Sequence, residues 1–450
     1  MLFNSIDFAI FLPIVFFLYW FVTAKHLKTQ NILIVLSSYV FYGWWDVRFL
    51  SLIVISTFID FCVGIKLGKE ENSKKRKQLL LLSVFVNLGF LGFFKYYNFF
   101  VENFVEAFSF LGYTFNVKTI NIVLPVGISF YTFQTMSYSI DVYRGKLQPT
   151  KDFIAFAAYV SFFPQLVAGP IERATNLLPQ FYYKRFFSYD KAIDGMRQIL
   201  WGFFKKLVIA DNCAEFVNYI FGNSDNMPGS ALAIGTIFFA FQIYGDFSGY
   251  SDIAIGLAKL FGFSLMQNFA FPYFSRDIAE FWRRWHISLS TWFRDYVYIP
   301  LGGSKNGTAK SIRNTLIIFL VSGFWHGANW TFLVWGFINA LLFIPLLISD
   351  KNRKNIEIIK PSFNFRGIYE IIKMFATFLI TCFAWIFFRA ENLNHALKIV
   401  SRIFSKSLFT EFHFPISNDI KFDSYYSDIF YKHRMDWKET KIWNRMGSKY

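Results

Sequence analysis

The stretch NTLIIFLVSGFWHGANWTFLVWGFINALLFIPLLIS, residues 314–349, decides the fold class of this chain. His326 is its only ionisable side chain. Because one crossing of a bilayer needs about 20 apolar residues, a run of this length predicts two membrane helices rather than one. Gly323, Gly327 and Asn329 mark the place of the bend, so we expect His326 near a helix end at membrane depth.

Further charge-poor runs of spanning length occur along the rest of the chain. They cover 8–24, 29–45, 49–65, 78–94, 119–140, 153–171 and 226–245, with a shorter run at 374–388. Hydrophobic residues make up 54% of the chain and charged residues 17%, which is more apolar than one soluble core requires. The pattern predicts an all-α, polytopic transmembrane protein with about nine to eleven membrane segments. Residues 1–402 are expected to form one membrane domain, followed by a polar and aromatic tail, 403–450.

The charge distribution predicts the orientation in the membrane. The most basic early loop, KLGKEENSKKRK (66–77), is assigned to the cytoplasm by the positive-inside rule, which leaves the N-terminus extracytoplasmic. The first apolar run lacks a basic start and a cleavage site, so it reads as a retained span of an inner-membrane protein. The net charge of +16 is explained by contact with membrane lipid, without a nucleic-acid partner.

The run 153–171 has basic segments on both sides, so both of its ends are expected in the cytoplasm. Pro164, Gly169 and Pro170 permit the turn that such a re-entrant segment needs. Non-helical backbone at that depth is stable only where protein or water covers it. A single kinked span remains the alternative.

Two polar segments have more than one interpretation. Between Ile278 and Tyr296, aromatic and aliphatic residues recur at steps of three and four, which predicts an amphipathic interfacial helix. Its arginines either contact lipid phosphate or dock an anionic cofactor or partner, with His286 at the rim of a cavity. These arginines are Arg283, Arg284 and Arg294.

The segment QIYGDFSGYSD (242–252) follows an apolar run. Asp246 and Asp252 either line a polar vestibule or belong to a helix cap and a loop. Walker, GxGxxG, GxSxG and HExxH motifs are absent, and Cys62, Cys213 and Cys382 suggest neither a disulfide framework nor a zinc site. No metal site is expected.

Four ordered motifs resemble the membrane-bound O-acyltransferase (MBOAT) family. They are PQLVAGPI (164–171), QIYGDFSGYSDIAIGLAKLFGF (242–263), FWRRWHISLSTWFRDYVYIPLGGS (281–304) and GFWHGANW (323–330). The likeness covers most of 1–395 and is strongest to the bacterial branch that O-acetylates alginate, with the D-alanyl-transfer protein of teichoic acids as a relative. It implies a ring of tilted helices around a thinned centre, with funnels from both faces that meet near the family's histidine.

The resemblance also implies the chemistry and the partners. His326 matches the family's histidine and His286 its second, less essential polar position; Trp325 and Asn329 are supporting residues. The acyl group would come from a cytoplasmic thioester, acetyl-CoA or an acyl-carrier protein, with no permanently bound cofactor. It would reach an exported or cell-surface polysaccharide, often through a separate extracytoplasmic acyltransferase, here expected to be of the SGNH type.

This expectation agrees with the chemistry of the residues. A thioester is already activated, so the protein mainly has to orient a hydroxyl and accept its proton, a task for a neutral imidazole. Alternatives are D-alanyl transfer to a cell-wall polymer, a lipid or glycan transporter with His326 as a polar gate, and a scaffold for a glycan synthase. One departure from the family is visible: members usually continue with hydrophobic spans, and none follows Phe388. Truncation and divergence of the last residues both stay open.

Overall fold

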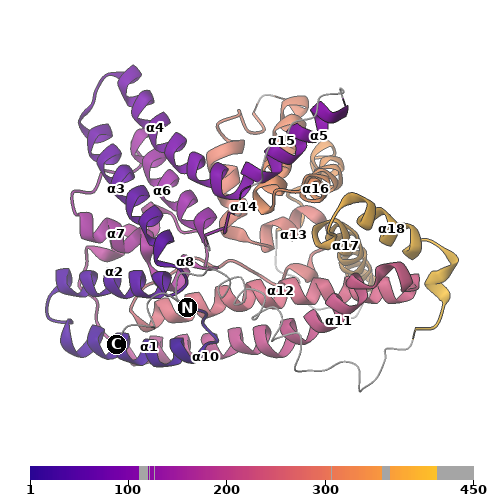
Figure 1. The fold of residues 1–450 in the computed structure, drawn as a ribbon, viewed down its shortest axis with the longest axis horizontal. Coiled ribbons are helices and arrows are strands. Elements are labelled where there is room, and N and C mark those ends of the chain that lie inside the picture. Colours follow the sequence, from indigo (N-terminus) through magenta and orange to yellow (C-terminus); the bar gives the residue numbers. More distant parts are fainter. Residues whose placement is uncertain (111–119, 121, 126, 306, 357–364, 413–450) are drawn as a thin grey trace, which may run out of the picture.

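The computed structural model describes residues 1–412 apart from 111–119, 121, 126, 306 and 357–364. Every regular element within these residues is a helix, which confirms the predicted fold class (Figure 1). In chain order the elements are α1 (Ile6–Phe17), η1 (Leu18–Val22), α2 (Leu27–Gly43), α3 (Val47–Lys69), α4 (Ser73–Leu91), η2 (Gly92–Tyr96), α5 (Tyr97–Phe110), α6 (Ile128–Tyr143), α7 (Phe153–Ser161), α8 (Phe163–Leu166), α9 (Ala174–Leu177), η3 (Leu178–Phe181), α10 (Tyr189–Phe203), η4 (Phe204–Ala210), α11 (Asp211–Gly222), η5 (Ser224–Asn226), α12 (Gly229–Leu260), η6 (Pro272–Phe274), α13 (Ile278–Arg284), α14 (Ile287–Phe293), η7 (Arg294–Tyr298), α15 (Thr308–His326), α16 (Trp330–Ile348), α17 (Phe365–Arg389), α18 (Leu393–Ile403) and η8 (Lys406–Phe409). Most of the predicted tail, 413–450, lies outside the described residues.

Five helices among the described residues are long and apolar enough to cross a membrane, fewer than the nine to eleven segments predicted. They are Val47–Lys69, Ser73–Phe110, Gly229–Leu260, Trp330–Ile348 and Gly367–Arg389. Other predicted runs form shorter helices or helices with many polar residues. In α6, Thr132, Gln134 and Ser137 are buried, because this helix packs inside the protein instead of facing lipid. The chain is a multi-pass membrane protein.

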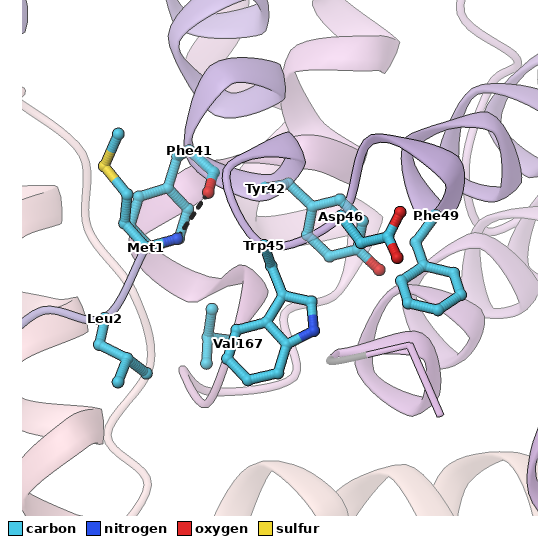
Figure 2. A pocket seen from close by; sticks show the side chains of 8 residues that line it. All are labelled: Met1, Leu2, Phe41, Tyr42, Trp45, Asp46, Phe49 and Val167. Carbon is cyan, nitrogen blue, oxygen red and sulfur yellow. Dashed lines mark hydrogen bonds between the residues drawn. The ribbon is translucent and has the colours of Figure 1, made fainter. Parts of the chain in front are cut away.

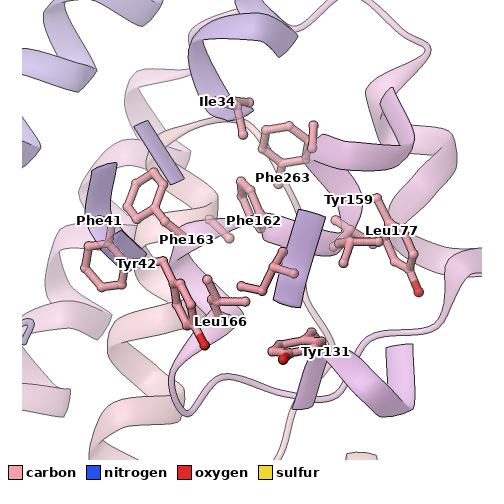
Figure 3. Packing of buried hydrophobic residues seen from close by; sticks show 14 of the residues in the cluster. Ile34, Phe41, Tyr42, Tyr131, Tyr159, Phe162, Phe163, Leu166, Leu177 and Phe263 are labelled. Atoms are coloured by element: carbon pink, nitrogen blue, oxygen red, sulfur yellow. The ribbon is translucent and has the colours of Figure 1, made fainter. Parts of the chain in front are cut away.

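The run 153–171 breaks where its prolines and glycine predicted a turn. Helix α7 ends at Ser161, Phe162 leaves the helical conformation, and α8 has only four residues. Phe162, Phe163 and Leu166 are almost completely buried in the first of the hydrophobic clusters (Figure 3). Protein therefore covers the break, as a non-helical segment at membrane depth requires.

Helix α12 runs beside α10 along one edge of the molecule (Figure 1) and continues through residues 242–252 to Leu260. The cap-and-loop interpretation of that segment is therefore wrong. Glycines of α10 allow its close approach to α12, because a Cβ on Gly202 would lie only 2.6 Å from the carbonyl oxygen of Gly249, and one on Gly195 only 2.7 Å from that of Gly256.

The C-terminal end of α12 is joined to the start of the chain. The Tyr19 hydroxyl donates to the carbonyl oxygen of Phe261 at 2.9 Å, and the Trp20 indole donates to that of Leu260 at 3.0 Å. Both donors lie in the π-helical turn η1 that ends the first helix. The N-terminal helices are thus fixed to the central helix through its last, otherwise unpaired carbonyl groups.

The segment from Ile278 to Tyr296 is not one interfacial helix, so that prediction is wrong. It forms α13, a break at His286 in the left-handed conformation (φ 44°, ψ 54°), α14 and the π-helical turn η7. The aromatic side chains of Phe281, Trp285 and Trp292 are at most 5% exposed. Their regular spacing serves packing against the protein interior rather than insertion into a membrane surface.

The run 314–349 forms a helical hairpin, as predicted. Helix α15 ends at His326 and α16 begins at Trp330, so the bend falls at 327–329. Two glycines let the backbones touch: a Cβ on Gly323 would lie 2.3 Å from the carbonyl oxygen of Phe332, and one on Gly336 2.3 Å from that of Phe319. The hairpin thereby holds His326 at a helix end.

Candidate active site

His326 is the last residue of α15 and lies in an aromatic surround. Its ring centroid is 4.8 Å from that of Trp325 and 5.2 Å from those of both Trp335 and Phe388, all edge-on. The histidine is half-buried rather than sealed. An imidazole in this position can meet a substrate while the neighbouring rings exclude most water.

His286 is completely buried, so its predicted position at the rim of a cavity is wrong. Its Nδ1 lies 3.0 Å from the side-chain oxygen of Asn268, which also accepts from the backbone N–H of Ser288 at 3.3 Å. Because that oxygen is an acceptor, Nδ1 carries the hydrogen of a neutral ring. The lone pair then lies on Nε2, which is buried and has no hydrogen-bond partner among the described residues.

Trp325 lies between the two histidines. Its ring centroid is 6.2 Å from that of His286 and 4.8 Å from that of His326. It also stacks on Phe133 of α6 with 5.5 Å between centroids. The structure therefore brings together the side chains of His286, Trp325 and His326.

Asn329 has a structural position. As the N-cap of α16 its side-chain oxygen accepts from the backbone N–H of Thr331 at 3.0 Å, and its side-chain nitrogen donates to the carbonyl oxygen of Glu391 at 2.7 Å. Both polar atoms hold the turn after His326 and tie it to the end of α17. Asn329 thus supports the site through its backbone rather than by pointing its amide at a reacting group.

The predicted arginines are engaged elsewhere and do not converge on His326. Arg283 donates to the backbone carbonyl groups of Asn352 and Asn355 at 2.7 and 3.0 Å. Arg284 pairs with the buried carboxylate of Glu280 at 2.6 Å. The Arg283 contacts attach α13 to the segment that follows α16, whereas the Arg284 pair lies within α13.

The remaining predicted residues also form ion pairs. Arg294 pairs with Asp295 at 2.7 Å, and its side chain is 59% exposed. Asp246 pairs with Lys206 of η4 at 2.6 Å, and Asp252 pairs with Lys205 of the same turn. The two aspartates fasten α12 to η4, so the vestibule interpretation gains no support from their contacts.

One charged residue beside the site was missed. The Lys95 ammonium, in the π-helical turn η2, donates to the carbonyl oxygen of Trp325, and the neighbouring Tyr96 hydroxyl donates to that of Phe324 at 2.9 Å. Lys95 is the only charged residue between Lys77 and Glu102. That isolated charge inside an apolar run was the available signal.

A separate cavity of about 130 Å³ lies among the first helices (Figure 2). Its lining is mainly apolar, and the Met1 ammonium at its edge donates to the carbonyl oxygen of Phe41 at 2.8 Å. The lining residues are Met1, Leu2, Phe41, Tyr42, Trp45, Asp46, Phe49 and Val167. None of them belongs to the histidine site.

Comparison with known proteins places this arrangement in a family. Residues 149–388 match the model of the membrane-bound O-acyltransferase family, MBOAT. The chain is 41% identical to the probable alginate O-acetylase AlgI of Azotobacter vinelandii, over 90% of the chain and 78% of that protein. It is 35% identical to the peptidoglycan O-acetyltransferase of Helicobacter pylori, over 89% and 79%.

A more distant relative is the teichoic acid D-alanyltransferase of Bacillus subtilis, 27% identical over 61% of the chain and 71% of that protein. The matched residues 149–388 include both histidines and the hairpin that holds His326. This chain therefore belongs to the membrane-bound O-acyltransferase family and is an O-acyltransferase of the membrane.

Proposed function

We propose that the chain takes an acyl group, acetyl in the simplest case, from a cytoplasmic thioester and passes it through the membrane for O-acylation of an exported or cell-surface polysaccharide. The donor would be acetyl-CoA or an acyl-carrier protein, used as a substrate rather than held as a cofactor. The half-buried imidazole of His326, fixed at a helix end among aromatic rings, carries this proposal. The names of the relatives, alginate O-acetylase and peptidoglycan O-acetyltransferase, support a polysaccharide acceptor.

In this reaction His326 acts as the general base. It accepts the proton of the attacking hydroxyl and returns it to the sulfur that leaves, so no net proton is lost. General-base help of this kind contributes about 10² to 10⁴ in rate. The hairpin contributes by holding the imidazole in place, because a well-oriented group avoids the entropy cost of finding the substrate.

The basic segments support an orientation in the inner membrane. Lys310 and Arg313 lie near the start of α15, and Lys351, Arg353 and Lys354 follow α16. The positive-inside rule assigns these ends, like the loop 66–77, to the cytoplasm, with an extracytoplasmic N-terminus. His326 then lies toward the opposite face, where an SGNH-type acetyltransferase would receive the acyl group.

Replacement of His326 by alanine tests the proposal. Membrane vesicles from a strain whose own copy is replaced by each variant are given [1-¹⁴C]acetyl-CoA, and label in the extracted polysaccharide is counted. We expect His326→Ala to lower transfer by about 10² or more, without lowering the amount of protein in the membrane. His26→Ala, at an exposed histidine, is the matched control. Normal transfer by His326→Ala would overturn the proposal.

D-alanyl transfer is the second candidate, favoured by the more distant relative from Bacillus subtilis. The same vesicles given a D-alanyl thioester on a carrier protein distinguish the two, because only the true donor will label the polymer. A transporter would move its cargo and leave the acyl group on the thioester, so label in the polymer that depends on His326 would exclude it.

A further inference from the structure

Lys95 places a positive charge inside a membrane helix. It belongs to the helical arm Ser73–Phe110, which is long and apolar enough to span a bilayer, and it is half-buried there. Ionisable side chains within membrane segments are costly, and they usually mark a functional site. The contacts of Lys95 identify that site.

The ammonium of Lys95 and the imidazole of His326 flank the same indole. Lys95 Nζ lies 5.3 Å from the ring centroid of Trp325, whose centroid is 4.8 Å from that of His326. Among the ion pairs of the described residues, none involves Lys95, so its charge has no carboxylate partner there.

Capping of α15 does not by itself explain the charge. The last carbonyl groups of a helix lack partners, and Lys95 satisfies that of Trp325. The adjacent carbonyl of Phe324 is satisfied by the neutral hydroxyl of Tyr96. A neutral donor at position 95 would make the same bond without the cost of a charge in the membrane.

The local backbone supports a functional role. Lys95 and Tyr96 lie in η2, a single π-helical turn between α4 and α5. Such turns inside longer helices occur frequently at functional sites. An ammonium has three N–H donors, and the carbonyl oxygen of Trp325 uses one of them. Two donors therefore remain for a ligand beside His326.

We propose that Lys95 is a catalytic residue that stabilises the negative charge on the thioester carbonyl oxygen during acyl transfer at His326. This inference rests on the proposed function. The acceptor oxygen attacks the carbonyl carbon, a C–O bond forms, and the carbonyl electron pair moves to oxygen, where the ammonium of Lys95 donates to it. When the carbonyl re-forms, the C–S bond breaks, and the thiolate takes the proton that His326 removed from the hydroxyl.

Three substitutions test this role in the vesicle assay with [1-¹⁴C]acetyl-CoA. Lys95→Met removes charge and donors, Lys95→Gln keeps a neutral donor for the cap, and Lys95→Arg keeps the charge. Loss of one oxyanion donor typically lowers kcat by about 10² to 10³. We expect that loss for Met and Gln, with the KM for acetyl-CoA changed less than about threefold, and at least partial rescue by Arg. Lys74→Met, at an exposed position of α4, is the matched control.

Several outcomes would overturn the inference. If Lys95→Gln is as active as Lys95→Arg, the side chain at position 95 serves only to cap the end of α15. A rise in the KM for the acceptor with unchanged kcat would mean that Lys95 binds the acceptor and does not stabilise the thioester carbonyl oxygen. A Lys95→Met variant as active as the parent, in an assay where His326→Ala is inactive, would refute the role of Lys95 and leave the proposed function intact. Activity in both variants would refute the proposed function as well.

Discussion

Replacing Gly323 by alanine should damage both stability and catalysis through the hairpin that carries His326. The added Cβ would lie 2.3 Å from the carbonyl oxygen of Phe332, on the facing helix. That is about 1 Å short of ordinary van der Waals contact, and a backbone oxygen cannot rotate away as a flexible side chain can. Helices α15 and α16 must therefore separate.

The size of the effect follows from that displacement. Overpacking of this kind costs about 1–3 kcal/mol, and the alanine's better helix propensity offsets only up to about 1 kcal/mol of it. His326 is three residues farther along the same helix, so its imidazole moves with the backbone. A misplacement of about 1 Å at a reacting group can lower the rate by about 10².

Thermal unfolding in detergent and label transfer in vesicles measure the two effects. Gly89→Ala is the matched control, because nothing lies within 4 Å of a Cβ added to this helical glycine. We expect it to be as stable as the parent or more stable, with normal transfer. If Gly323→Ala had the same melting temperature and the same rate as Gly89→Ala, the close packing of the hairpin would not be what positions His326.

Three further substitutions test the surroundings. Asn268→Leu should lower both the melting temperature and kcat, because leaving the Nδ1 hydrogen of His286 without an acceptor costs about 1–3 kcal/mol; unchanged values would show that another group replaces it. Glu280→Gln should lower the melting temperature markedly, since this carboxylate is 1% exposed between two arginines and breaking a buried pair costs about 3–5 kcal/mol; equal stability would mean that water compensates. Arg294→Ala should leave transfer unchanged, because an exposed ion pair contributes at most about 1 kcal/mol; a rise in the KM for acetyl-CoA would restore the anion-docking interpretation.

The helical class, the hairpin bend and the pair of histidines could be predicted from the sequence because each depends on local information. A charge-free run too long for one span and a Gly-rich centre suffice to place the turn before α16. The motifs around His286 and His326 are local as well. Packing against distant helices was not needed for any of these inferences.

The errors arose where distant partners decide the structure. GDFSGYSD reads as a cap and a loop, yet α12 continues through it, because α10 approaches its glycines and η4 supplies lysines for Asp246 and Asp252. The spacing of aromatic residues around His286 suggested one helix, since a left-handed residue cannot be read from periodicity. The charge of Lys95 was visible, but its position beside Trp325 depends on how α4 and α5 pack.

The bonds from Tyr19 and Trp20 to the end of α12 join the first helices to the second half of the chain, so the two parts depend on each other. Residues 149–388 contain both histidines, but the carbonyl groups at the end of α15 are held by Lys95 and Tyr96, which precede that region. A protein that began at residue 149 would keep all four motifs but would lack the Lys95 and Tyr96 bonds to the end of α15 and the Tyr19 and Trp20 bonds to the end of α12. If the chain is divided at residue 149, we expect activity only when both parts are produced in the same membrane.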